Sequence, residues 1–191
     1  MDRRQFVTAA AAALGGSLAA PALAQTAVSS AAQWSLPERF MAQRVVVRPG
    51  WNAGDIHVDP GLHYIYLIEP GDTAIRYGCA IGEEEQYVRG EFTIQRRVEW
   101  PSWTPTANMI RREPDKYAQY ADGVPGGPDN PLGARALYLY KDGRDTMLRI
   151  HGTPQPWSIG RSVSSGCIRM VNQHVIDLYD RVPNGTRVVL H

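Results

Sequence analysis

Short runs rich in β-branched and aromatic residues alternate with turn-forming residues along most of this chain. Turn signals such as Asp59-Pro60-Gly61 and Pro183-Asn184-Gly185 separate the runs. Regular short runs with such punctuation predict a mainly β fold, arranged as a sandwich or a barrel-like sheet. The predicted strands are Arg44–Val47, Asp55–Val58, Tyr64–Ile68, Thr73–Ile81, Glu91–Val98, Arg135–Tyr140, Met147–His151 and Thr186–Leu190.

One segment near the end of the chain has the spacing of a helix instead. Its apolar residues fall at i, i+3, i+4 and i+7, which places them on one helical face. We predict one short helix from Gln173 to Val182, with Asn172 as its N-cap and Pro183 as its stop. The apolar face consists of Val175, Leu178, Tyr179 and Val182.

The stretch Glu113–Gly133 is polar and rich in glycine and proline, which predicts a long loop. Long loops in compact domains often serve as lids or binding loops. The sequence leaves two interpretations open. The segment covers a functional cleft, or it is an insertion tolerated on the surface.

Residues 1–24 have the features of an export signal. Arg3 and Arg4 form a basic start, an Ala-rich apolar stretch follows, and Ala22-Leu23-Ala24 fits a cleavage site. The paired arginines favour a twin-arginine signal, with a Sec signal and a membrane anchor as the alternatives. We therefore predict a signal peptide over 1–24, a linker over 25–43, a folded domain over 44–191, and a periplasmic location.

Net charge, apolar runs and the number of cysteines exclude several classes of protein. The 191 residues carry a net charge of +1, which argues against nucleic-acid binding because that function needs a basic face. Beyond the signal, no apolar run is long enough to span a membrane. Two cysteines, Cys79 and Cys167, are too few for a disulfide scaffold. Neither metal-ligand spacing nor a glycine-rich nucleotide motif is present, so we expect no metal and no cofactor.

The residues capable of nucleophilic chemistry lie between Ile150 and Met170. Cys167 follows a Ser-Ser-Gly turn, and His151 ends a predicted strand. A thiol attacks as thiolate, and imidazole is a natural acceptor for its proton near neutral pH. The backbone amides of Ser165, Gly166 and Cys167 are candidates for an oxyanion site. Taken alone, the cysteine would be interpreted as a buried apolar residue and the histidine as structural.

The block reads His-Gly-Thr at 151–153, Ile-Gly at 159–160 and Ser-Ser-Gly-Cys-Ile-Arg-Met at 164–170. It resembles the signature of the L,D-transpeptidase catalytic domain, the YkuD-like fold. The resemblance extends to Glu99-Trp100-Pro101-Ser102-Trp103 and to Asn130-Pro131-Leu132-Gly133. It spans about Asp55 to His191 and implies a mixed β-sandwich or barrel with one short helix after the catalytic turn.

The resemblance implies a role for each motif residue. Cys167 is the expected nucleophile and His151 the expected general base and acid. Ser164 matches a serine that can hold the catalytic histidine, and Gly166 a glycine of the oxyanion site. The supporting residues also include Gly152, Ser165 and Arg169, the last either shaping the site, meeting substrate or forming a structural ion pair. Ser165 departs from the family, which commonly has histidine at this position.

By resemblance, the protein is a periplasmic cysteine acyltransferase acting on peptidoglycan tetrapeptide stems. D-Ala leaves, a thioester remains, and an amine of a second stem or of a protein accepts the acyl group. Two alternatives stay open: an L,D-carboxypeptidase or cross-link hydrolase of the same fold, and a non-catalytic module that binds the cell wall. We expect a monomer without a stable membrane span after signal cleavage, and no nucleic-acid partner.

Overall fold

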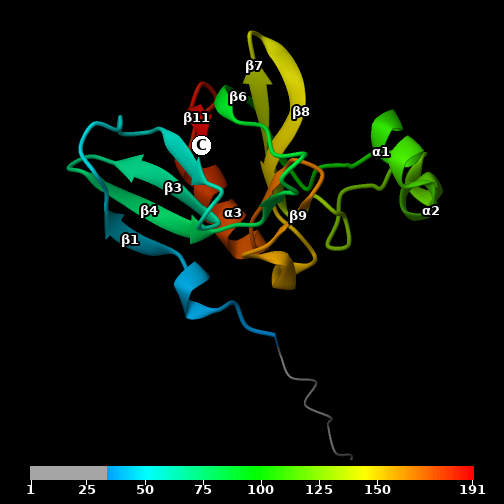
Figure 1. Cartoon of the computed structure of the whole chain (residues 1–191), viewed down its shortest axis with the longest axis horizontal. Coiled ribbons are helices and arrows are strands. Elements are labelled where there is room, and N and C mark those ends of the chain that lie inside the picture. Colours follow the sequence, from blue (N-terminus) through cyan, green and yellow to red (C-terminus); the bar gives the residue numbers. More distant parts are fainter. Residues whose placement is uncertain (1–33) are drawn as a thin grey trace, which may run out of the picture. The chain divides into compact units, whose positions relative to one another are not determined.

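The computed structural model describes residues 34–191. The predicted signal peptide and the first part of the predicted linker lie outside the described residues. The polypeptide from Trp34 to His191 forms one compact unit. In this unit the mainly β fold that the sequence predicts is confirmed (Figure 1).

A nine-stranded sheet in the order β1-β4-β3-β2-β11-β6-β7-β8-β10 forms the body. It is open, with β1 and β10 as its edges, although a single antiparallel bridge between Ala80 and Arg169 connects β10 to the chain after β4. Most neighbours are antiparallel, but β10 pairs with β8 and β11 pairs with β2 in parallel. The strands are β1 (Gln43–Val46), β2 (Ile56–Asp59), β3 (Tyr64–Glu69), β4 (Thr73–Gly78), β6 (Gly90–Glu99), β7 (Arg135–Lys141), β8 (Arg144–His151), β10 (Ile168–Arg169) and β11 (Arg187–Leu190).

The predicted strand Thr73–Ile81 is divided in the structure. Strand β4 ends at Gly78, and β5 (Ile81–Gly82) pairs in parallel with β9 (Ser162–Ser164) as a separate two-stranded sheet. Cys79, between the two strands, is fully buried. The division matters for the site because β9 leads directly into the turn that carries Cys167.

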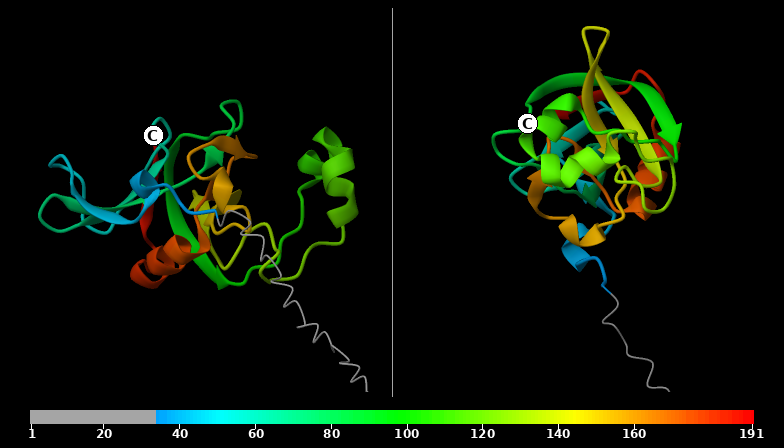
Figure 2. Two further views of the ribbon diagram at one scale, coloured as in Figure 1. Left: turned by 90° about the horizontal axis from the view of Figure 1, so that it is seen from below. Right: turned by 90° about the vertical axis from the view of Figure 1, so that its right-hand side faces the viewer.

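Helix α3 (Asn172–Arg181) is the predicted helix, shifted by one residue. Its N-cap is Val171, without a side-chain cap, so the assignment of Asn172 as N-cap was wrong. Instead, Asn172 Oδ1 accepts a hydrogen bond from the Ala134 backbone N–H at 3.0 Å, where β7 begins. The buried Val175 and Leu178 place α3 against β7 and β8 and close the main core (Figure 2).

The domain begins earlier than the predicted boundary at residue 44. A short 3-10 helix, η1 (Glu38–Phe40), precedes β1. Phe40 is buried against Ala80 and Ile159, so the last part of the predicted linker belongs to the folded unit. The apolar residues of 25–43 follow neither a helical nor a strand period, so the sequence provides no signal for this packing.

The predicted loop 113–133 contains helical turns and belongs to a larger excursion. We call residues 101–132 the arm; it carries α1 (Ala107–Arg112), α2 (Pro114–Tyr117) and the 3-10 helix η2 (Ala118–Tyr120). The Thr106 side chain caps α1 by accepting from Met109 N–H at 3.2 Å, and Pro114 opens α2. No helix among the described residues is long and apolar enough to cross a membrane.

Candidate active site

The site is formed by side chains that point to the same side of two neighbouring strands, β8 and β10. Ile150 of β8 lies opposite Ile168 of β10, and both are fully buried in the core. Because side chains alternate along a strand, the residues on either side of these isoleucines point away from the core. Those flanking residues are Arg149 and His151 on β8, and Cys167 and Arg169 around β10; all four line one cleft.

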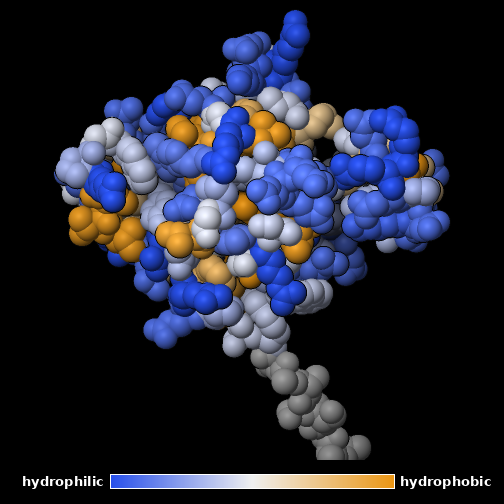
Figure 3. All heavy atoms as spheres, in the orientation of Figure 1, coloured by the Kyte–Doolittle hydropathy of each residue, from blue (hydrophilic) through white to orange (hydrophobic). Residues whose placement is uncertain are grey.

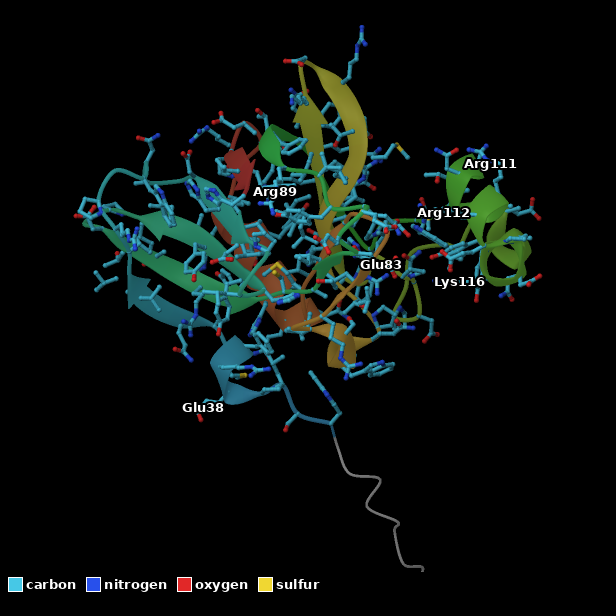
Figure 4. All side chains as sticks on the ribbon, in the orientation of Figure 1. Glu38, Glu83, Arg89, Arg111, Arg112 and Lys116 are labelled. Atoms are coloured by element: carbon cyan, nitrogen blue, oxygen red, sulfur yellow. The ribbon has the colours of Figure 1, made fainter. Side chains whose placement is uncertain are left out.

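The cleft has a volume of about 1020 Å³ and lies between the strands and the arm. Trp103, Tyr117 and Tyr120 of the arm line it together with the motif residues. Arg112 Nη2 donates to Ser165 Oγ at 3.4 Å, which places α1 beside the nucleophile turn. Figure 3 shows the surface hollowed between the arm and the body, and Figure 4 shows Arg112 and Lys116 on the side of the arm nearer the body. The arm therefore lies on the catalytic side of the domain, as the lid interpretation requires.

A backbone carbonyl orients the imidazole of His151. Its Nδ1 lies 2.6 Å from the Gly152 carbonyl oxygen, and a carbonyl can only accept, so Nδ1 carries the proton. The other nitrogen, Nε2, is thereby left as the proton acceptor. Burial, reinforced by the positive charge of Arg169, lowers the pKa of His151 to about 3, so the ring is neutral at neutral pH.

Gly152 fits between His151 and the start of α3 because it has no side chain. A Cβ on Gly152 would collide with Asn172 Oδ1, the atom that also accepts from Ala134. The start of α3 therefore packs directly against the residue that follows His151. Gly152 supports the site through its carbonyl and this close approach.

The thiol of Cys167 is only partly exposed and contacts β8. Its Sγ–H donates to the Met147 carbonyl at 3.7 Å. Burial raises the pKa of Cys167, while the backbone N–H of Arg149, donating to the sulfur, partly lowers it. At neutral pH the thiol and the imidazole are accordingly both uncharged, and a neutral imidazole can accept the proton of a thiol.

The turn before the nucleophile differs in detail from the motif-based expectations. Ser164 Oγ donates to the Cys167 carbonyl at 2.5 Å and accepts from Gly166 N–H at 3.2 Å, so it braces the turn and does not hold His151. Gly166, at φ +113°, permits the turn, but its N–H is already used. Of the three candidate oxyanion amides, Ser165 and Cys167 remain.

Arg169 faces the cleft with no acidic partner among the described residues, so the ion-pair interpretation was wrong. Its Nε is buried without a hydrogen-bond partner in residues 34–191, and burial lowers the pKa of the group. Neighbouring Arg149 is different, because Asp145 binds it through both carboxylate oxygens at 2.7 and 2.9 Å. Arg169 is thus available to an anionic group of a ligand.

A bulge in β8 forms the contact with the thiol, and no pattern in the sequence indicates it. Tyr138 lies opposite Arg149 and Tyr140 opposite Asp145, so three β8 residues face Leu139 alone. Met147 takes a left-handed conformation at φ +64°. Thr146 Oγ1 donates to the Leu139 carbonyl at 2.5 Å and accepts from Leu148 N–H at 3.2 Å, while Asp145 Oδ1 accepts from Met147 N–H at 2.8 Å.

We expect Thr146→Val to lower kcat/KM about 10- to 100-fold, since small displacements of a nucleophile carry penalties of this order. The substitution keeps the shape of the side chain but removes the hydroxyl that fixes the bulge. Alkylation of Cys167 should show a shifted pH profile in the variant. Thr186→Val is the matched control, because the Thr186 hydroxyl donates only to the Pro183 carbonyl in the turn before β11. A variant that loses thermal stability but keeps the wild-type alkylation profile would show that the bulge is merely structural.

Among residues 34–191, no group of three or more histidine, cysteine, aspartate or glutamate side chains is placed to hold a metal ion. Both cysteines are free. The four cleft residues that flank Ile150 and Ile168 offer a thiol, an imidazole and two guanidinium groups.

Comparison with known proteins bears on the family of this domain. The family model described as L,D-transpeptidase catalytic domain, YkuD, matches residues 53–190. A probable L,D-transpeptidase ErfK/SrfK of Escherichia coli is 45% identical over 96 residues, which are 50% of this chain and 29% of that protein. The chain thus spans about a third of the length of this relative.

Two solved structures are similar. One, of a protein described as a probable carnitine operon oxidoreductase from Brucella melitensis, is 47% identical with a TM-score of 0.56 over 82% of this chain and 96% of that one. The other, an L,D-transpeptidase from Xylanimonas cellulosilytica, shares the fold at 18% identity, with a TM-score of 0.51 over 75% of this chain and 64% of that one. With the family model covering the whole region from β2 to β11, this chain belongs to the L,D-transpeptidase catalytic domain family.

Proposed function

We propose that this protein is a periplasmic cysteine L,D-transpeptidase that acts on peptidoglycan tetrapeptide stems. The observation that carries the proposal is the pairing of β8 with β10, which directs His151 and Cys167 into one cleft. The oxidoreductase name of the similar Brucella protein suggests redox chemistry as a second interpretation. The cleft residues do not favour it, because a thiol and a neutral imidazole that line one cleft suit acyl transfer.

The proposed reaction has two steps that use the same proton acceptor. Cys167 Sγ–H gives its proton to His151 Nε2, and the thiolate attacks the carbonyl between the L-centre of diaminopimelate and D-Ala. The backbone N–H of Cys167 stabilises the oxyanion. The C–N bond then breaks as the imidazolium protonates the amine of D-Ala, leaving a thioester on Cys167.

In the second step an acceptor amine attacks the thioester carbonyl. His151 takes the proton of the amine, the C–S bond breaks, and the thiol is restored. Arg169, which has no acidic partner among the described residues, is proposed to bind a carboxylate of the stem. No step needs a metal or an organic cofactor.

The test is incubation of the purified protein with tetrapeptide muropeptides, followed by mass spectrometry. We expect release of D-Ala, a covalent acyl adduct on Cys167, and cross-linked dimers. Tripeptide without dimer would identify a carboxypeptidase. Absence of both D-Ala and adduct would overturn the proposed activity and favour a wall-binding module.

The arm is proposed to exclude water from the thioester, so shortening it should raise hydrolysis relative to transfer. The outer part of the arm can be deleted without opening its base, because Trp103 and Val124 form an antiparallel bridge there. Its N–H to carbonyl distances are 2.9 and 2.7 Å. Replacing residues 104–123 by Asn-Gly would join the bridge as a tight hairpin. We expect the tripeptide-to-dimer ratio to rise severalfold.

Arg112→Gln is the companion variant for this deletion. It keeps α1 but weakens the contact of the arm with Ser165. A smaller shift toward tripeptide in this variant would fit a lid that closes through that contact. An unchanged product ratio in the well-folded deletion would contradict the role of the arm.

A further inference from the structure

A second cavity lies on another face of the domain and shares no residue with the catalytic cleft. Its volume is about 460 Å³, within the range of about 300–1,000 Å³ that is usual for small-ligand sites. The lining residues are Trp51, His57, Asp59, Pro60, Gly61, Tyr66, Arg89 and His191. In Figure 4, Arg89 lies away from the arm that carries Arg112 and Lys116.

The alternation of β2 explains how these residues come together. Ile56 and Val58 point into the core and are fully buried, so His57 and Asp59 point to the opposite face. Tyr66 of β3 lies directly opposite His57, and His191 follows the parallel neighbour β11. The cavity is therefore built on the outer face of three adjacent strands, which provides a rigid base.

Aromatic rings form one wall of the cavity. The indole of Trp51 stacks on the His57 imidazole, with centroids 4.2 Å apart and an interplanar angle of 7°. The Tyr66 ring meets the same indole edge to face at 6.2 Å. Although one face of Trp51 is covered in this way, 37% of the residue remains exposed. Such an anchored indole is a platform for a flat apolar surface.

Polar groups of both charges surround this wall. Arg89 forms no ion pair among the described residues, and Asp59 uses Oδ1 to bind the N–H groups of Gly61 and Leu62, leaving Oδ2 available. Burial lowers the pKa of His57, which keeps its ring neutral. One carboxylate and one guanidinium balance each other, so the cavity favours a neutral ligand with several hydroxyl or amide groups.

We propose that this cavity binds a sugar ring, which stacks its apolar C–H face on Trp51 while its polar groups bond Asp59 and Arg89. The identity of the natural ligand rests on the proposed function: it is an N-acetylated sugar of the peptidoglycan glycan strand. This second contact with the glycan would keep the polymer bound while the catalytic cleft acts on its peptide stems. Two weak contacts on one polymer raise the effective concentration of the stems at Cys167.

The test uses ¹⁵N-labelled Cys167→Ala protein titrated with the N-acetylglucosamine trisaccharide and followed by NMR. We expect saturable perturbation of the Trp51 indole N–H with a dissociation constant on the order of 1 mM. Trp51→Ala should weaken binding about tenfold. Trp157→Ala is the matched control, because Trp157 is also exposed but lines neither cavity.

Asp59→Asn is a second variant, which keeps the test informative if Trp51→Ala does not fold. Asparagine keeps the acceptor that the Gly61 N–H needs, so the turn survives while the charge is lost. We expect binding to fall several-fold in this variant. Absence of binding, affinity that neither variant changes, or perturbation confined to Trp103 of the cleft would overturn the proposal. Because the readout needs no turnover, its failure is distinguishable from failure of the muropeptide assay.

Discussion

Cys167→Ala should abolish D-Ala release and acyl-adduct formation while leaving the fold unchanged. Cys167 is the proposed nucleophile and lines the cleft, and alanine removes its sulfur without changing the buried Ile168 that follows it. The measurement is mass spectrometry of the protein after incubation with tetrapeptide muropeptides. Thermal unfolding of the variant should match that of the wild-type protein. Turnover by a folded Cys167→Ala protein would contradict the central assignment.

Cys79→Ala is the natural control for this experiment, because Cys79 is the other thiol of the chain. It is fully buried, and burial raises its pKa far above the usual range, which makes it unreactive. We expect this variant to be acylated normally, with some loss of stability from the small cavity. A neutral alkylating agent should modify Cys167 and spare Cys79 in the folded protein.

The strands were predictable because runs of β-branched and aromatic residues between turn signals mark them locally. Strands β9 and β10, by contrast, contain three and two residues, too few to produce a pattern. They exist because distant partners bind them. Arg169 exchanges two hydrogen bonds with Ala80, both of 2.8 Å, and Ser164 accepts from Glu83. Such pairing between remote segments cannot be inferred from one stretch of sequence.

The site, like the strands, has features that the sequence predicts and features that it does not. Cys167 and His151 could be proposed as nucleophile and base because both stand in a recognisable block, and the structure places both in one cleft. The β8 bulge could not, because it depends on Thr146 reaching the Leu139 carbonyl across the β7–β8 hairpin. The partner of Ser164 was misassigned for a related reason. Its hydroxyl is satisfied within its own turn by Gly166 and Cys167, and only the folded backbone shows this.

His151→Ala should lower kcat/KM at least about 100-fold, the usual scale of a general acid–base contribution. In the wild-type protein the base must be neutral, and its pKa is lowered to about 3. Protonation of His151 should therefore not limit the rate between about pH 6.5 and pH 5, where an ordinary histidine would. A pH–rate profile that falls with a midpoint near the ordinary histidine pKa of about 6.5, through protonation of His151, would contradict the neutral, buried imidazole.

The same shift makes a prediction for stability, and its sign follows from proton binding. Between pH 6.5 and about 3 the unfolded chain binds a proton at residue 151 that the folded protein does not, so the folded state loses stability as the pH falls. Removing the imidazole removes this contribution. The stability of His151→Ala should thus decline less steeply over that interval than the wild type in denaturant titrations. Burial also lowers the pKa values of His57, His63 and His174, so both proteins should retain a decline in common, and the difference between them reports His151 alone.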